Sequence, residues 1–215
     1  IINMGDGNDT VYIGSFGGTY AFSQNINGEA GSDTISFGGV NIPADYTGLD
    51  YAFETGVNLD LSITSAQVVS NLPVSLTVSN IENAIGSKFS DYLKGTVAVN
   101  LLTGGAGNDT IDGGDGYDTA IYLATRTASS IVKNLDGSIS ISSLPDGSDT
   151  LRNIEFVQFA DQTVKLAPTI TSGADINVLE NILNSTIIYT ATASSVIANS
   201  IVYSIVGGAD ASPLS

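Results

Sequence analysis

A nine-residue period between Gly86 and Ile121 constrains the fold of this chain more than any other feature. Four rows align without gaps, and they read GSKFSDYLK, GTVAVNLLT, GGAGNDTID and GGDGYDTAI. Each row has a six-residue turn that ends in an acid or its amide, followed by a three-residue strand whose middle residue is apolar. The sixth position of the successive rows holds Asp91, Asn100, Asp109 and Asp118.

Rows this short cannot form a core alone, because each offers one inward side chain, so they must stack on one another. If two rows make one coil, rows eighteen residues apart lie over each other at the strand spacing of about 4.8 Å. Asp91 then lies over Asp109, and Asn100 over Asp118. Stacked carboxylates repel unless a cation separates them, and a hard divalent ion suits Asp and backbone carbonyl oxygens. Glycine lets such turns adopt positive φ and point several carbonyls at one centre.

These rows resemble the GGxGxDxUx nonapeptides of RTX proteins, the calcium-binding β-roll family of secreted bacterial toxins, proteases, lipases and adhesins. The resemblance implies an all-β fold built on a right-handed parallel β-roll, a solenoid in which stacked turns share Ca²⁺. Rows one and two lack the second and fourth glycines of the pattern, so we expect weaker or empty sites there. The ligands implied by the resemblance are the side chains of Asp91, Asn100, Asp109 and Asp118 and the carbonyls of Gly104, Ala106, Gly113 and Asp115.

A second and less regular patch opens the chain, where MGDGNDTVY and GEAGSDTIS place Asp9 and Asp33 in the sixth position. Because these two residues are 24 positions apart, the segment 13–27 must bulge out or add a partial coil. By the same resemblance we predict Asp9 and Asp33 as further ligands, with Asp9 stacked on rows further upstream. The alternative for every such patch is that Gly, Asn and Asp form tight turns without metal, but this does not explain acids at ninefold spacing.

The segment between the two patches shows alternating apolar residues, which predict a β insertion over 40–80. Within it, residues 57–87 resemble the segment that leads into RTX rolls. Its acids Asp60 and Glu82 are ligand candidates, although a solvated strand face is the simpler account of both. After the rows, residues 130–166 predict hairpins with LDGS and PDGS turns, which would cap the exposed strand edges of the roll.

Pro168 marks a boundary, and the segment after it resembles the first strands of cadherin-like or immunoglobulin-like sandwich repeats. About fifty residues are too few for a complete sandwich. We therefore predict five parts: an N-terminal roll portion (1–40), a β insertion and entry segment (41–85), the nonapeptide roll (86–122), capping hairpins (123–166) and a partial β-sandwich (167–215).

Composition limits the chemistry open to this chain of 215 residues. With 22 acids, 6 bases and a net charge of -16, nucleic acid and anionic membranes are poor partners, whereas cations are favourable ones. The absence of cysteine and histidine removes disulfides, thiolate sites and the usual zinc ligand. No apolar run approaches the roughly 18 to 20 residues that span a bilayer, so we predict no transmembrane segment.

These observations predict a calcium-binding, calcium-folded structural module of a large secreted or cell-surface protein, an adhesin or surface-layer protein. The resemblance also implies type I secretion. Cell-surface polysaccharide or the surface of a host or neighbouring cell is the expected partner, with self-association through an exposed coil as a further option. The alternative is the secretion and folding appendage of an exported protease, lipase or polysaccharide-modifying enzyme. Catalysis by the segment itself would need carboxylates such as Glu54, Glu82 or Glu155, and since an isolated strand glutamate is usually just solvated, we predict no enzyme.

Overall fold

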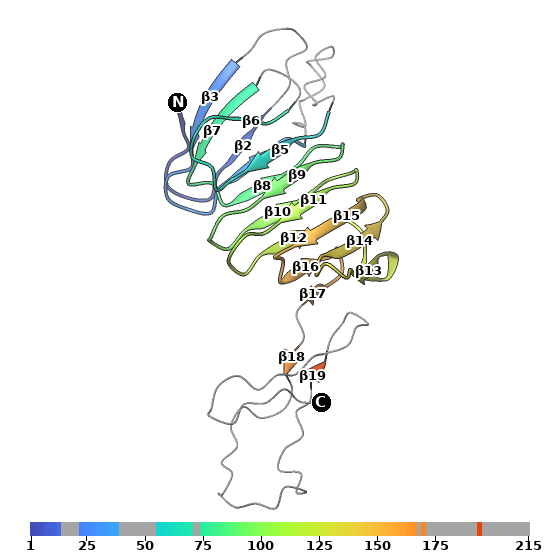
Figure 1. Ribbon diagram of the computed structural model, residues 1–215. Helices are drawn as coiled ribbons and strands as arrows, with labels where there is room; N and C mark the ends of the chain where they lie inside the picture. The colour runs from blue at the N-terminus through green and yellow to red at the C-terminus, as the bar shows by residue number, and fades with distance from the viewer. Residues whose placement is uncertain (14–21, 39–54, 71–73, 167–168, 171–192, 195–215) are drawn as a thin grey trace, which may run out of the picture.

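The computed structural model describes residues 1–13, 22–38, 55–70, 74–166, 169–170 and 193–194, shown in colour in Figure 1. These residues form short strands joined by turns, with one 3-10 helix, η1 (Arg126–Ala128), and no α-helix in the described ranges. The predicted all-β class is confirmed, and the two largest sheets mix parallel and antiparallel pairs. The described part of the chain also contains no helix long and apolar enough to cross a membrane.

Two large sheets carry most of the strands. The seven-stranded sheet has the order β17-β16-β12-β10-β8-β4-β2, and the six-stranded sheet has the order β13-β14-β15-β11-β9-β5. The strands of the first are β2 (Thr10–Tyr12), β4 (Thr34–Ser36), β8 (Asn83–Ile85), β10 (Leu101–Thr103), β12 (Thr119–Ile121), β16 (Phe156–Gln158) and β17 (Thr163–Lys165). Those of the second are β5 (Asn58–Asp60), β9 (Tyr92–Lys94), β11 (Thr110–Asp112), β13 (Ser130–Lys133), β14 (Ile139–Ser143) and β15 (Gly147–Arg152).

Successive strands from β8 to β12 alternate between these two sheets, so every second row stacks in parallel. Ile111 pairs with Leu93, and Leu102 pairs with Ala120, each across eighteen positions. The predicted register of the nonapeptide rows is therefore confirmed. Figure 1 shows these three-residue strands lying one beside the next along the body of the molecule.

The core consists of the middle residues of these short strands. Successive strand residues point to opposite faces, so a three-residue strand turns only its centre inward. Leu93, Leu102, Ile111 and Ala120 are each 0% exposed. Together with the inward residues of the neighbouring strands they form one hydrophobic cluster.

A smaller four-stranded sheet lies near the N-terminus, with β1 (Ile2–Asn3), β3 (Phe22–Asn27), β7 (Val74–Ser79) and β6 (Gln67–Val68) in that order. Strand β3 takes up the extra residues between β2 and β4, and it pairs in parallel with β7 over six residues. As in the nonapeptide rows, one strand of another sheet lies between β2 and β4 in the sequence, and the two pair directly although they are not a multiple of nine apart. Asp9 thus lies over Asp33.

Hairpins follow the last nonapeptide row, as predicted. Strands β13, β14 and β15 are antiparallel, and their connections contain the LDGS and PDGS sequences. Strand β15 also pairs in parallel with β11, and β16 with β12, so the hairpins continue both sheets beyond the repeat.

The predicted sandwich falls largely outside the described residues, and the predicted β insertion falls partly outside them. In the predicted sandwich, only β18 (Thr169–Ile170) and β19 (Ala193–Ser194) are described, and they form an antiparallel pair. In the predicted β insertion, residues 39–54 and 71–73 lie outside the described ranges, and with them Glu54. The limits of all five parts remain predictions.

Candidate metal centre

The two most regular turns, 104–109 and 113–118, depend on glycine for their backbone shape. Their second and fourth residues have φ of 102° and 130° in the first turn, and 93° and 137° in the second. A side chain disfavours this left-handed region, which explains the glycine at Gly105, Gly107, Gly114 and Gly116. In the two earlier rows, hydroxyl groups shape the turn instead, since Ser87 and Thr96 accept hydrogen bonds from Phe89 N–H and Ala98 N–H.

The sixth-position acids form a ladder of hydrogen bonds from row to row. Asp109 Oδ1 accepts a hydrogen bond from Asp91 N–H at 2.8 Å, and Asp118 Oδ1 accepts one from Asn100 N–H at 2.8 Å. Asp33 Oδ1 accepts one from Asp9 N–H at 2.9 Å. Each bond holds one carboxylate oxygen against the preceding row and leaves the second oxygen for another partner.

That second oxygen has no partner in several of the described turns, regular and less regular ones alike. Oδ2 of Asp9, Asp33, Asp109 and Asp118 is buried and makes no hydrogen bond. The side chains of Asp33 and Asp118 are 0% exposed. Because a buried acceptor without a donor is costly, each oxygen is a ligand position that a cation would satisfy.

Asp91 and Asn100 differ, since hydrogen bonds already occupy their oxygens. Asp91 accepts from Val57 N–H, Ser87 N–H and Ser87 Oγ. Asn100 Oδ1 accepts from Thr96 N–H, and Asn100 Nδ2 donates to the carbonyl of Glu82. The two nonapeptide rows that lack both the second and the fourth glycine are thus also the rows whose sixth-position oxygens already have hydrogen-bond partners.

Electrostatics around the free oxygens favour a positive partner. Burial raises the pKa of Asp109 to about 7, with a further contribution from the nearby Asp149, even though the hydrogen bond from Asp91 N–H opposes it. Burial also raises the pKa of Asp118 to about 6, and Glu155 adds to the rise. Ionised carboxylates are therefore disfavoured here unless a proton or a cation compensates their charge.

Backbone carbonyls and sixth-position side chains line the spaces next to the first glycines of the rows. A Cβ placed on Gly104 would lie 2.1 Å from Asp109 Oδ2, and one on Gly86 would lie 2.3 Å from the carbonyl oxygen of Gly104. One on Gly95 would lie 2.3 Å from the carbonyl oxygen of Gly113. The first glycine of each row therefore leaves a space lined by oxygen atoms. The carbonyls of Ala106 and Asp115, both exposed residues of the same turns, remain predicted ligands.

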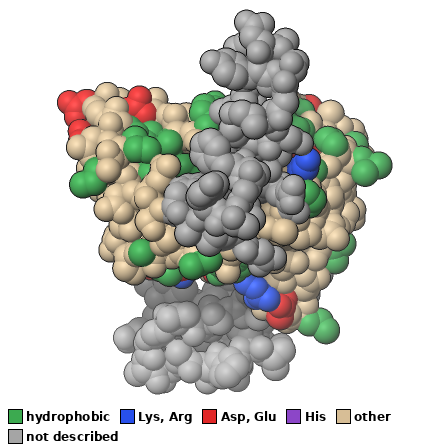
Figure 2. Space-filling model, turned by 90° about the horizontal axis from the view of Figure 1, so that it is seen from above, with side chains coloured by type: hydrophobic (Ala, Val, Ile, Leu, Met, Phe, Trp, Pro, Cys, Tyr) green, Lys and Arg blue, Asp and Glu red, His purple; other side chains and the backbone are tan. Residues whose placement is uncertain are grey.

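This donor set fits Ca²⁺, which binds carboxylate and carbonyl oxygens with flexible geometry. Within the described ranges, no cluster of three or more His, Cys, Asp or Glu side chains could hold a metal. An ion would therefore be shared between carboxylates of stacked turns and the carbonyls around them. Figure 2 shows few acidic side chains on the described part of the face that it presents.

Three further carboxylates extend the ladder of hydrogen bonds, a role that was not predicted for them from the sequence. Asp149 Oδ1 accepts from Asp109 N–H at 2.8 Å, Glu155 Oε2 accepts from Asp118 N–H at 2.8 Å, and Glu82 Oε2 accepts from Asp33 N–H at 2.9 Å. The solvated-face interpretation of Glu82 is wrong, because its carboxylate holds the turn below it. One signal was available for both glutamates, since the tripeptide Asn-Ile-Glu occurs at 80–82 and again at 153–155.

Asp60, the other ligand candidate, and Asp161 have ordinary partners. Asp60 forms an ion pair with Lys94, with 3.3 Å between Oδ2 and Nζ. Asp161 Oδ1 accepts a hydrogen bond from Arg126 N–H. Neither belongs to the ladder.

Comparison with known proteins agrees with this geometry. The family model of the RTX calcium-binding nonapeptide repeat, in four copies, matches residues 85–120. The match implies that the chain binds Ca²⁺ through these repeats, which are generally non-catalytic. A search of curated proteins finds no match.

Proposed function

We propose that residues 1–166 form a calcium-folded structural module whose stacked rows make a right-handed parallel β-roll. The alternation of successive strands between two sheets and the parallel register across eighteen residues support this architecture. The observation that carries the function is the set of buried Oδ2 atoms without hydrogen-bond partners on Asp9, Asp33, Asp109 and Asp118.

In this proposal, the free oxygens of Asp109 and Asp118 are the central ligands, and the carbonyls of Gly104, Ala106, Gly113 and Asp115 complete their sites. Asp9 and Asp33 hold calcium in the same way nearer the N-terminus. Asp91 and Asn100 contribute weaker positions because their oxygens already accept hydrogen bonds. Bound calcium supplies the positive charge that the buried carboxylates otherwise lack.

Calcium then decides when the chain folds. A net charge of -16 opposes compaction, and an ion that binds only the folded state stabilises it by mass action. Since free calcium is scarce inside cells and abundant outside, such a chain folds after export. We therefore place it in a secreted or cell-surface protein exported by type I secretion, with an adhesive or surface-layer role. A cell-surface polysaccharide or a neighbouring cell is the proposed partner.

Calorimetric titration with Ca²⁺ tests the ligand assignment. Asp109→Asn keeps an oxygen that can accept from Asp91 N–H but removes the charge, so we expect calcium affinity to fall about 10- to 100-fold for at least one ion. Asp161→Asn is the matched control, because Asp161 is exposed and lies outside the ladder, and its affinity should not change. No heat of calcium binding by the unmodified chain, or equal affinity in all three proteins, would remove the basis of the proposal.

A further inference from the structure

The two Asn-Ile-Glu turns occupy equivalent places in the seven-stranded sheet. Turn 80–82 follows turn 28–33 in the stack, and turn 153–155 follows turn 113–118. Their backbone hydrogen bonds match: Gly28 N–H donates to Ser79 and Gly113 N–H donates to Arg152, each at 3.0 Å. In both turns the glutamate N–H and the next N–H donate to the carbonyl of the aspartate below, which is Asp33 or Asp118. A tripeptide therefore replaces a six-residue glycine turn at both places.

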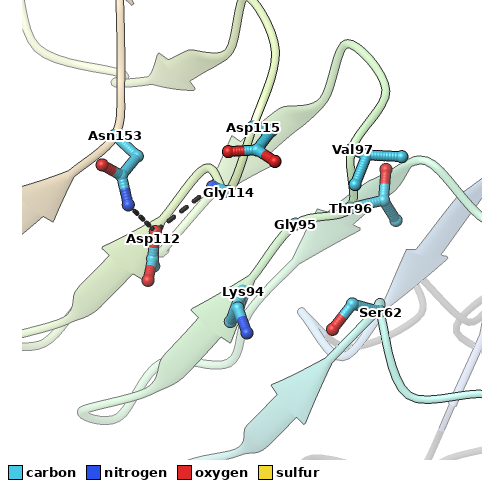
Figure 3. A pocket seen from close by; sticks show the side chains of 9 residues that line it. All are labelled: Ser62, Lys94, Gly95, Thr96, Val97, Asp112, Gly114, Asp115 and Asn153. Carbon is cyan, nitrogen blue, oxygen red and sulfur yellow. Dashed lines mark hydrogen bonds between the residues drawn. The ribbon is translucent and has the colours of Figure 1, made fainter.

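The asparagine has the same unusual conformation in both turns. Asn80 has φ of 51°, and Asn153 has φ of 50°. The side-chain amide of Asn80 donates to Asn27 Oδ1 at 2.8 Å, and that of Asn153 donates to Asp112 Oδ1 at 2.7 Å. Figure 3 shows the second of these bonds at the edge of a surface pocket, with Gly114 N–H donating to the same Asp112 oxygen. Each asparagine is thus fixed by its side chain.

As a result, each asparagine turns its carbonyl oxygen toward a buried, unpartnered carboxylate oxygen. A Cβ on Gly28 would lie 1.9 Å from Asn80 O and 2.5 Å from Asp33 Oδ2. A Cβ on Gly113 would lie 2.1 Å from Asn153 O and 2.6 Å from Asp118 Oδ2. The same two kinds of oxygen surround Gly86 in the nonapeptide rows, where the carbonyl comes from Gly104.

We propose that the two Asn-Ile-Glu turns complete a pair of equivalent calcium sites, one with Asp33 and one with Asp118. In each site the aspartate Oδ2, the asparagine carbonyl and the glutamate carboxylate are ligands, in addition to any carbonyls of the glycine turn below. The inference rests on the proposed calcium-dependent function. It extends calcium binding to residues 80–82 and 153–155, both outside the matched repeats.

A purely structural role for these glutamates explains less. It accounts for the hydrogen bonds from Asp33 N–H and Asp118 N–H, and the burial of Ile81 and Ile154 anchors both turns. It does not account for an aspartate oxygen that is buried with no donor and faces a carbonyl. Carbonyl and carboxylate oxygens repel when nothing positive lies between them, whereas a divalent cation attracts both.

Glutamine substitution separates the two roles. Glu155→Gln and Glu82→Gln keep an oxygen that can accept the hydrogen bond from the aspartate N–H but remove the negative charge. We expect each variant to lose one calcium ion per chain, or to bind one ion about 10- to 100-fold more weakly, in calorimetric titration. The matched control is Glu29→Gln, since Glu29 is an exposed glutamate of turn 28–33 and should keep the full calcium count.

The outcomes separate this inference from the proposed function. If the unmodified chain binds no calcium, both fail. If it binds calcium and both glutamine variants match it in ion count and affinity, only the inference fails. Anomalous diffraction from crystals of the unmodified chain grown with calcium gives a readout that does not depend on a variant folding. A calcium peak in contact with Asp118 Oδ2 and Asn153 O supports the site, and calcium peaks at the nonapeptide turns with none there overturn it.

Discussion

The two carboxylate oxygens of Asp118 have different roles. Its Oδ1 accepts from Asn100 N–H and thereby fixes the register of the row below. Its Oδ2 is buried without a donor and faces the space that Gly113 leaves open. One side chain therefore stabilises the stack and creates the demand for a cation. Glycine at the first position of the row is part of the same arrangement.

Filling that space should cost both stability and calcium affinity. Gly113→Ala brings a methyl group to 2.1 Å from the backbone oxygen of Asn153, which cannot move away as a flexible side chain can. We expect a loss of about 1–3 kcal/mol in the free energy of unfolding, measured by urea denaturation in saturating calcium. Gly38→Ala is the control, since its nearest neighbours would be 3.5 Å away, and it should behave as the unmodified protein does. Equal losses in both variants would argue against a lined space at Gly113.

The raised carboxyl pKa values predict an unusual pH dependence in chelator. In the folded state the pKa is about 7 for Asp109 and about 6 for Asp118 and Asp149, against 3.8 for an ordinary Asp. The folded state therefore binds these protons more tightly than the unfolded state, and this stability is lost as pH rises through 6 to 7. Calcium should reverse the trend, because protons compete with it for the same oxygens. Thermal unfolding at pH 5 and pH 8, with and without calcium, checks the direction of the pH dependence under both conditions. Greater stability at pH 8 in chelator would contradict the expectation.

The strand elements stabilise the fold through one inward residue each. In β10, Leu102 is 0% exposed and lies in the shared core, whereas its neighbour Leu101 is 41% exposed. Because a three-residue strand has no second inward position, no other residue of the row can compensate for a change at the centre. The stability of each short strand therefore depends on a single inward residue.

Leu102→Ala and Leu101→Ala form a matched pair within this strand. Truncating Leu102 removes buried methyl groups and leaves a cavity, so we expect a loss of about 2–5 kcal/mol in the free energy of unfolding. Truncating Leu101 should cost much less because its side chain is partly solvated. Urea denaturation in saturating calcium measures both, and similar losses for the two variants would contradict the assignment of inward and outward faces.

Asp146 joins the hairpins to the segment that directly follows the rows. This buried carboxylate accepts from Leu123 N–H at 2.9 Å and from Ala124 N–H at 3.0 Å. Asp146→Ala leaves both donors unsatisfied, and we expect it to destabilise the chain by about 2–3 kcal/mol in thermal or urea unfolding. Asp115→Ala changes the charge equally at an exposed site and keeps the backbone carbonyl, so it should have little effect. A stable Asp146→Ala protein would show that the hairpins do not depend on this contact.

At the scale of the whole molecule, acidity and burial oppose each other. The chain carries a net charge of -16, and yet several of its acids lie inside the stack. Cations that bind only the folded form resolve this conflict, adding about 2.7 kcal/mol per site when the ion is at 100 times its dissociation constant. Several such sites would make folding a steep function of calcium concentration.

Sequence reasoning succeeded where the pattern is regular. Asp91 and Asp109 are eighteen residues apart within an unbroken period, so their stacking followed from the spacing of the rows. Asp9 and Asp33 are predictable as ligands from their turns, but their 24-residue separation does not follow the nine-residue period, so their pairing did not follow from it.

The ladder beyond the repeat could not be read from the nine-residue pattern. Asp149 meets Asp109 across 40 positions and Glu155 meets Asp118 across 37, after hairpins of irregular length. Glu155 reaches the same position from a shorter turn because its side chain is one methylene longer than that of Asp. Only the recurrence of Asn-Ile-Glu links it to Glu82.

Calcium-driven folding is best tested by far-UV circular dichroism of the chain after chelation, followed while calcium is raised, with magnesium as the control ion. We expect a largely unfolded spectrum in chelator and a cooperative change to β-structure with calcium but not with magnesium. A full β spectrum in chelator at pH 8, unchanged by calcium, would mean that the glycine and aspartate rows are turns alone and that calcium does not drive folding.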